Sequence, residues 1–364
     1  MDRKTILILF FLLQIVLYTA AARTVQPKES DFPAFYSAAR IWASGRNPYD
    51  LEAQCSVQEP IRGVPCLPFA HPPVLLPLIS LVSNDDFISS YYRWLLVLVL
   101  VTALCVLPLY RLCGEWKLSV QTILFFPIVV AITFAQDTPF ILLGVVLWIW
   151  LLTSKREVLA GLVLSISVLK PQIAILLAVP LLFSRPRAFA GFLLGAAVLG
   201  VYSFALVGVD GFRGALRIVQ VMSQGQGYGV NPQVMQNATA LLVRSGLSAV
   251  WSWPVFALGV IAISIYWKKK GTSLRKLSAG IIVALFTAPH LHFHDLSLLT
   301  PGLLLIHPLA AMLCSVVLLS SYAFALQQWS GYGIMLLLLI FHLKPLPALQ
   351  NNFRTLTHRA DASS

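Results

Sequence analysis

The chain has 364 residues, of which 58% are hydrophobic and only 11% charged, with a mean hydropathy of +0.81. Soluble domains carry about 25% charged residues, so this composition excludes a soluble globular protein and indicates a chain that lies mostly in lipid. The net charge of +12 does not indicate a nucleic-acid partner, because the basic residues are spread over short loops between apolar runs, as membrane orientation requires.

The apolar runs predict an all-α polytopic protein, a single integral membrane domain over residues 1–364. A perpendicular span needs about 20 residues and several runs are shorter, so we expect tilted or broken helices and about 10 to 13 spans in total. The runs cover residues 5–22, 87–110, 119–135, 138–153, 157–169, 171–184, 188–208, 248–267, 277–289, 296–306, 309–326 and 330–342.

The first run is either the first span or a cleavable signal peptide, because Met1-Asp-Arg-Lys4 precedes it. Both alternatives place the next segment, a long first outer loop over residues 23–86, on the extracytoplasmic side. Aromatic and small apolar residues recur there at helical spacing over 32–43, which predicts an amphipathic helix lying on the membrane surface. Pro33 suits the first turn of this helix and Gly45 suits its C-terminal cap.

Asp31 stands at the entry of this helix, near lipid but reachable from water, and is therefore a candidate catalytic base. The alternative is that Asp31 only caps the helix. Arg40 would contact either a phosphate or lipid headgroups. Cys55 and Cys66 flank a proline-containing piece of the same loop and would be able to pair in an oxidising compartment.

Lysines and arginines gather in alternate short loops, and these loops are predicted to be cytoplasmic, together with the tail 343–364. The outer face then holds residues 23–86, 136–137, 170, 209–247 and 290–295, where the unusual polar residues collect. No organellar signal accompanies the spans, so we expect a bacterial inner membrane.

Lys170 lies at the outer end of two apolar helices, a costly position unless the lysine has a partner or snorkels to the headgroups. His290, His292 and His294 alternate next to Asp295, which suggests either a metal site or a loop that binds phosphate and sugar. Asp295 and the break at Pro289 favour the second alternative, and no Cys/His spacing matches a zinc site, so no metal is expected.

Six segments, in this order, resemble the signatures of glycosyltransferase family 87, a group of GT-C membrane enzymes that includes polyprenol-phosphate-mannose-dependent mannosyltransferases. Two of them depart from the family pattern, with His71 in place of the usual tyrosine and Ala135-Gln-Asp137 in place of Gly-Gln-Asn. The segments are Asp31 to Asp50, Phe69 to Pro77, Ala135 to Asp137, Gly161 to Gln172 with its Lys170-Pro171 end, Asn231 to Asn237, and Pro289 to Asp295.

This resemblance implies a GT-C fold with an extracytoplasmic active site and Asp31 as the key acid. It implies a hexosyltransferase that uses a polyprenyl-phosphate sugar donor, with a lean towards mannose, a glycolipid or glycan acceptor, an inverting reaction and no cofactor. The candidate donor-binding residues are Lys170, His290, His292, His294, Asp295, Gln136 and Arg40. The alternative function is a polytopic transporter or flippase of lipid-linked glycans, which would share the hydrophobicity and Lys170.

Overall fold

The computed structural model describes residues 25–63, 66–223, 232–270, 272–305, 308–323 and 327–343, together with the isolated Leu12, Val16 and Thr19. The rest of the predicted first span 5–22, the segment 224–231 and the predicted tail beyond residue 343 lie outside the described residues.

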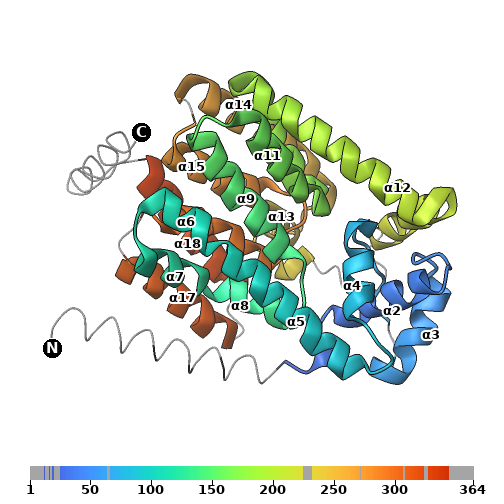
Figure 1. The fold of residues 1–364 in the computed structure, drawn as a ribbon. Helices are drawn as coiled ribbons and strands as arrows, with labels where there is room; N and C mark the ends of the chain where they lie inside the picture. The colour runs from blue at the N-terminus through green and yellow to red at the C-terminus, as the bar shows by residue number, and fades with distance from the viewer. Residues whose placement is uncertain are drawn as a thin grey trace.

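All regular elements in the described part of the chain are helices, as the apolar runs predicted (Figure 1). The α-helices are α2 (Phe32–Ala43), α3 (Leu51–Arg62), α4 (Leu76–Val82), α5 (Phe87–Leu104), α6 (Val106–Cys113), α7 (Trp116–Ile123), α8 (Phe126–Thr133), α9 (Thr138–Thr153), α10 (Glu157–Leu164), α11 (Pro171–Ser184), α12 (Pro186–Ser223), α13 (Ala238–Arg244), α14 (Ser252–Lys270), α15 (Leu274–Thr287), α16 (Thr300–Leu303), α17 (Pro308–Ala323) and α18 (Gln327–Leu343). The 3-10 helices are η1 (Pro27–Glu29), η2 (Pro73–Leu75), η3 (Ser165–Leu169), η4 (Pro232–Val234), η5 (Ala249–Trp251) and η6 (Phe293–Leu299).

Three helical stretches in the described residues are long and apolar enough to cross a membrane: Phe87–Cys113, Pro186–Val221 and Ala249–Lys269. Six shorter apolar helices of 10–17 residues accompany them, among them α9 and α11. This mixture of long and short apolar helices is what the sequence predicted for a polytopic protein with broken or tilted spans.

Helix α9 lies in the core, and its apolar side chains are buried on nearly every side. Next to it, α10 and α12 approach each other closely because glycines face the partner backbone. A Cβ atom on Gly161 would stand 1.8 Å from the Ala188 carbonyl oxygen, and one on Gly191 would stand 2.2 Å from that of Val158. Small residues of this kind allow helices to pack in lipid, where no hydrophobic effect drives them together.

The segment predicted to be the first outer loop forms a small helical unit, α2 to α4, at one end of the molecule, here called the first-loop unit (Figure 1). The predicted helix 32–43 is present, with Pro33 in its first turn and Gly45 at φ +75° just past its end. Its apolar face was expected to rest on lipid, but α3, α4 and α5 surround the helix and cover that face with protein. Apolar spacing locates a buried face but does not say whether lipid or protein covers it.

Helix α12 consists of two helical segments joined at Gly208, where the predicted apolar run 188–208 also ends, and the second segment, 209–223, lies in the stretch that we expected to be outer loop. It bends at Gly208, whose φ is +63°. On both sides of the bend it contacts the first-loop unit: Trp42 Nε1 donates to the Leu206 carbonyl at 2.9 Å and Asn47 Nδ2 to that of Asp210 at 3.2 Å.

Candidate active site

The turn between α8 and α9 is the centre of the polar cluster. Ala135 has φ +58°, a left-handed conformation that costs a non-glycine residue about 1–2 kcal/mol. Trp94 Nε1 donates a hydrogen bond to the Ala135 carbonyl at 3.0 Å, and the backbone amide of Gln136 donates to the Ala131 carbonyl at 2.8 Å. The next three side chains, Gln136 to Thr138, are buried and contact three different segments of the chain.

Gln136 contacts the candidate base. Its Nε2 donates to Asp31 Oδ2, while the Asp31 amide donates to the Phe134 carbonyl at 3.2 Å. The Asp31 side chain makes no capping hydrogen bond to α2, so the capping alternative is wrong. Burial raises the pKa of the Asp31 carboxyl, although the charges of His71, Lys170 and Arg62 oppose that rise. A carboxylate in this environment is suited to accept a proton.

Asp137 contacts the first-loop unit. Its Oδ2 pairs with His71 Nδ1 at 2.9 Å, and its other oxygen is buried without a hydrogen-bond partner in the described residues. The His71 ring packs on Phe35 with the centroids 4.6 Å apart, and the Tyr49 hydroxyl donates to the His71 carbonyl at 2.7 Å. The Asp137 oxygen is therefore available to accept a hydrogen bond from a bound hydroxyl.

Thr138 contacts the ion pair between Lys170 and Asp295. Lys170 Nζ donates to Thr138 Oγ1 at 3.1 Å, contacts His294 Nε2 at 3.2 Å and pairs with Asp295 Oδ1. Lys170 is only 8% exposed and Asp295 only 1%, so the snorkelling alternative is wrong and the lysine is held by partners. Burial alone would raise the pKa of Asp295, but the adjacent Lys170 ammonium holds it well below its ordinary value.

The protonation of His294 follows from this contact. An ammonium group has no acceptor, so His294 Nε2 accepts the hydrogen bond and the ring is neutral with its proton on Nδ1. Burial and the nearby Lys170 both lower the pKa of His294, which agrees with a neutral ring. Burial also lowers the pKa of His290, to about 3. These rings can therefore donate one hydrogen bond each but supply no positive charge near neutral pH.

The loop 288–295 is held in place by residues 237–239 at the start of α13. Asn237 Nδ2 donates to the Ala288 carbonyl at 2.6 Å, and Thr239 Oγ1 to the Pro289 carbonyl at 2.8 Å. Asn237 is fully buried, so glycosylation of the Asn237-Ala-Thr239 sequon is excluded in this fold. The His290 and His292 rings lie 4.5 Å apart, and the His292 amide donates to Asp295 Oδ2 at 2.9 Å.

The structure thus brings Asp31, Gln136, Lys170 and the His290–Asp295 segment together. Arg40 is not part of this group, because it is exposed and pairs with Asp85 on the surface. Within the described residues, no group of three or more His, Cys, Asp or Glu side chains is arranged to hold a metal ion.

Two participants, Thr138 and Arg62, were not found from the sequence. Thr138 follows Gln136-Asp137 directly, which was the available signal; Arg62 gave none, because a single arginine in a polar loop is commonplace.

Basic residues occupy the other end of these helices. Helix α9 runs from Thr138 at the site to Thr153, beside a surface cavity of about 910 Å³ that Lys155, Arg156, Arg185 and Arg187 help to line. Helix α11 connects the same two ends, from Pro171 next to Lys170 to Ser184 next to Arg185. At α9 and α11, the polar loops therefore lie at one end of the helical body and the basic loops lie at the other end.

Comparison with family models finds one match: glycosyltransferase family 87, over residues 69–301, more than half of the chain. Comparison with curated proteins and with solved structures finds no match. The matched range includes Gln136, Lys170 and the histidine segment, whereas Asp31 precedes it, so Asp31 joins the site through its contact with Gln136.

Proposed function

The chain belongs to glycosyltransferase family 87, and we propose that it transfers a hexose from a polyprenyl-phosphate donor to a glycolipid or glycan acceptor, with Asp31 as the general base. The observation that carries this proposal is the contact between Gln136 and a half-buried Asp31 that does not cap α2, because the same turn also contacts Lys170 and Asp295. One turn thus connects a proton acceptor to a positively charged group.

The reaction is a single inverting displacement. The acceptor hydroxyl loses its proton to Asp31 while its oxygen forms a bond to the anomeric carbon of the sugar. The bond between that carbon and the phosphate oxygen breaks, and its electron pair leaves with the polyprenyl phosphate. Positive charge near the departing phosphate lowers the barrier, because negative charge develops there.

The remaining polar groups have supporting roles. Gln136 orients the Asp31 carboxylate, and the free oxygen of Asp137 accepts a hydrogen bond from a sugar hydroxyl. The neutral His290, His292 and His294 donate hydrogen bonds to the donor head group. Mannose is the proposed sugar, on the basis of the family resemblance.

The site is proposed to face the outside of a bacterial inner membrane. The support is the distribution of charge, since Lys155, Arg156, Arg185 and Arg187 occupy the opposite end of α9 and α11 from the site. Lysines and arginines in short loops favour the cytoplasmic side. The polyprenyl chain then stays in the bilayer while its phosphosugar head enters the site.

A transfer assay tests the proposal directly. Purified full-length protein in liposomes would receive a labelled polyprenyl-phosphate sugar and a membrane lipid extract, and the labelled product would be identified. We expect transfer with the wild type and a loss of at least about 100-fold with Asp31→Asn, because the amide keeps the shape but accepts no proton.

The matched control is Asp50→Asn. Asp50 lies in the same outer loop and caps α3 by accepting a hydrogen bond from the Ala53 amide at 3.2 Å. Asparagine caps a helix equally well, so this variant should transfer sugar at the wild-type rate. Full activity of Asp31→Asn would remove Asp31 from the mechanism. Movement of label across the bilayer without transfer would favour a flippase.

A further inference from the structure

Two permanently charged groups, Lys170 and Arg62, act on the Asp31 carboxylate, and His71 also lies near it. His71 is paired through Nδ1 with Asp137, and the three donors of Lys170 all have protein partners. Arg62 differs, because its Nη1 group is buried and has no hydrogen-bond partner within the described residues. A buried guanidinium donor without a partner is unfavourable, so this group indicates a ligand.

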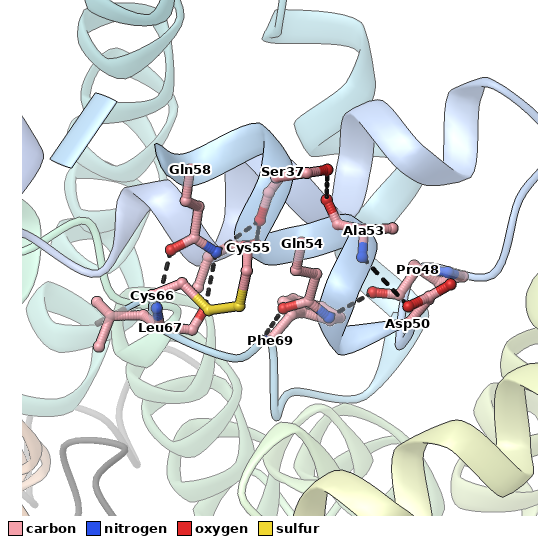
Figure 2. Close-up of a disulfide and its surroundings, with 12 residues drawn as sticks. Ser37, Pro48, Asp50, Ala53, Gln54, Cys55, Gln58, Cys66, Leu67 and Phe69 are labelled. Atoms are coloured by element: carbon pink, nitrogen blue, oxygen red, sulfur yellow. Dashed lines mark hydrogen bonds between the residues drawn. A yellow bond between two sulfur atoms is a disulfide. The ribbon is translucent and has the colours of Figure 1, made fainter. Parts of the chain in front are cut away.

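The end of α3, where Arg62 lies, is tied to its neighbours by contacts of the residues around Arg62. Arg62 is the last residue of α3, and one turn earlier Gln58 donates to Ser37 Oγ on α2 at 2.9 Å and to the Leu67 carbonyl at 2.8 Å. Cys55 and Cys66 form a disulfide (Figure 2), as their spacing in the sequence allowed. Arg62 lies between these two cysteines in the sequence and is therefore part of a short covalent loop. Helix α3 also packs against η1, directly before Asp31.

Lys170 is poorly placed to bind a substrate anion. Its ammonium group has three protons, and Thr138, His294 and Asp295 take all of them. Binding a phosphate would remove at least one of these contacts and would weaken the pairing of a buried carboxylate. Arg62 can bind an anion without losing any partner at Nη1.

We propose that Arg62 is the direct ligand of the donor phosphate and that Lys170 is a positioning residue for Asp295, His294 and Thr138. This inference rests on the proposed function and replaces the expectation that Lys170 binds the phosphate. A guanidinium group suits the task, because its fork of N–H donors matches two phosphate oxygens and its charge does not titrate. Because α3 packs against η1, two residues before Asp31, the proposed phosphate ligand and the proposed base lie on neighbouring segments.

An equilibrium binding experiment tests this without any chemistry. Purified full-length protein in detergent would be titrated with a sugar-free polyprenyl phosphate, with the neutral polyprenol and with inorganic phosphate. We expect Arg62→Gln to raise the Kd for polyprenyl phosphate by about 10- to 100-fold, the range for a lost hydrogen bond to a charged group. Arg62→Lys should lose less, because it keeps the charge without the fork.

The matched control is Arg46→Gln, in the same loop, because Arg46 is exposed and its Nε donates only to Ser44 Oγ at 3.3 Å. This variant should keep the wild-type Kd, and polyprenol should bind weakly and equally to all variants. Thermal unfolding checks that each variant is folded, and Arg62→Lys decides the question if Arg62→Gln does not fold.

Four results would overturn the inference. The first two are wild-type affinity in a folded Arg62→Gln or Arg62→Lys variant, and polyprenol binding as tight as that of polyprenyl phosphate. The other two are an equal loss of affinity in a folded Lys170→Gln variant, and full displacement of the lipid by inorganic phosphate at the lipid's own concentration. Arg62-dependent binding without sugar transfer would support Arg62 and overturn the proposed function alone. Sugar transfer together with polyprenyl-phosphate binding that does not depend on Arg62 would support the proposed function and overturn the role of Arg62.

Discussion

Asp31 combines two properties that an ordinary capping aspartate lacks. Its side chain leaves the helix amides uncapped and accepts a hydrogen bond from Gln136, and burial raises its pKa. Asparagine caps a helix about as well as aspartate, so Asp31→Asn would leave the stability unchanged if Asp31 acted only as a cap of α2. The stability of an Asp31 variant therefore distinguishes a base from a cap.

We predict that Asp31→Asn raises the thermal stability near pH 7. The folded protein holds the Asp31 proton more tightly than the unfolded chain, so the carboxyl favours folding only when protonated, and this contribution is lost as pH rises through the raised pKa. Asparagine removes the cost of burying the charge and still accepts the Gln136 hydrogen bond. Unfolding midpoints should differ at pH 7 and converge below about pH 4, the ordinary value for Asp.

The pH dependence of sugar transfer should follow the titration of the same Asp31 carboxyl group. Transfer by the wild type should fall on acidification through a pKa above the ordinary aspartate range, because only the ionised carboxylate accepts a proton. A stability of Asp31→Asn at pH 7 equal to or lower than that of the wild type would contradict this account.

At the scale of the elements, the position of Lys170 depends on how closely α10 and α12 pack. Helix α10 continues into η3, which ends at Leu169, directly before Lys170. Gly161 and Gly191 allow the two backbones to touch, and Gly195 faces Ser165, where α10 gives way to η3. The glycines of this contact thus set the distance between the long peripheral helix and the segment that carries the site lysine.

We predict that Gly191→Ala destabilises the protein by about 1–3 kcal/mol, the usual cost of overpacking, because the new Cβ would stand 2.2 Å from the Val158 carbonyl oxygen. The matched control is Gly200→Ala on the same helix, where no atom lies within 4 Å of the new Cβ. That change should be neutral or stabilise the helix by up to about 1 kcal/mol. Equal unfolding midpoints of the two variants would show that α10 and α12 do not pack through these glycines.

At the scale of the whole molecule, the buried pair of Lys170 and Asp295 connects segments that are far apart in the sequence. Lys170 precedes α11, Asp295 lies in η6, and Thr138 opens α9. The pair is almost fully buried, so each partner depends on the other for compensation of its charge. The convergence of the site is therefore coupled to the stability of the helical body.

We predict that Lys170→Met costs about 3–5 kcal/mol of stability, because it leaves Asp295 as a buried, unpaired carboxylate. The double variant Lys170→Met/Asp295→Asn should recover much of this loss, since the amide carries no charge and its oxygen still accepts from the His292 amide. Denaturant unfolding in detergent would measure both. A single variant as stable as the wild type would mean that the pair does not hold these segments together.

The sequence by itself determined the features that depend on local pattern. Apolar runs of helical length predicted the all-α membrane class, and Pro33 and Gly45 located the ends of α2, because these residues favour particular backbone angles wherever they occur. The loop charges predicted two chemically different ends, and the order of six short segments indicated the family. Unusual polar residues near apolar helices predicted the members of the site, namely Asp31, Gln136, Lys170 and the histidine segment.

Only the tertiary structure decided which of these residues meet. The apolar face of α2 is covered by protein instead of lipid, because neighbouring helices satisfy the same pattern equally well. Lys170 has three protein partners, and Arg62 has a buried donor without one, although both are simply cations in the sequence. Hydrogen-bond satisfaction depends on contacts across more than 100 positions, such as that between Lys170 and Asp295, and no local pattern encodes such contacts.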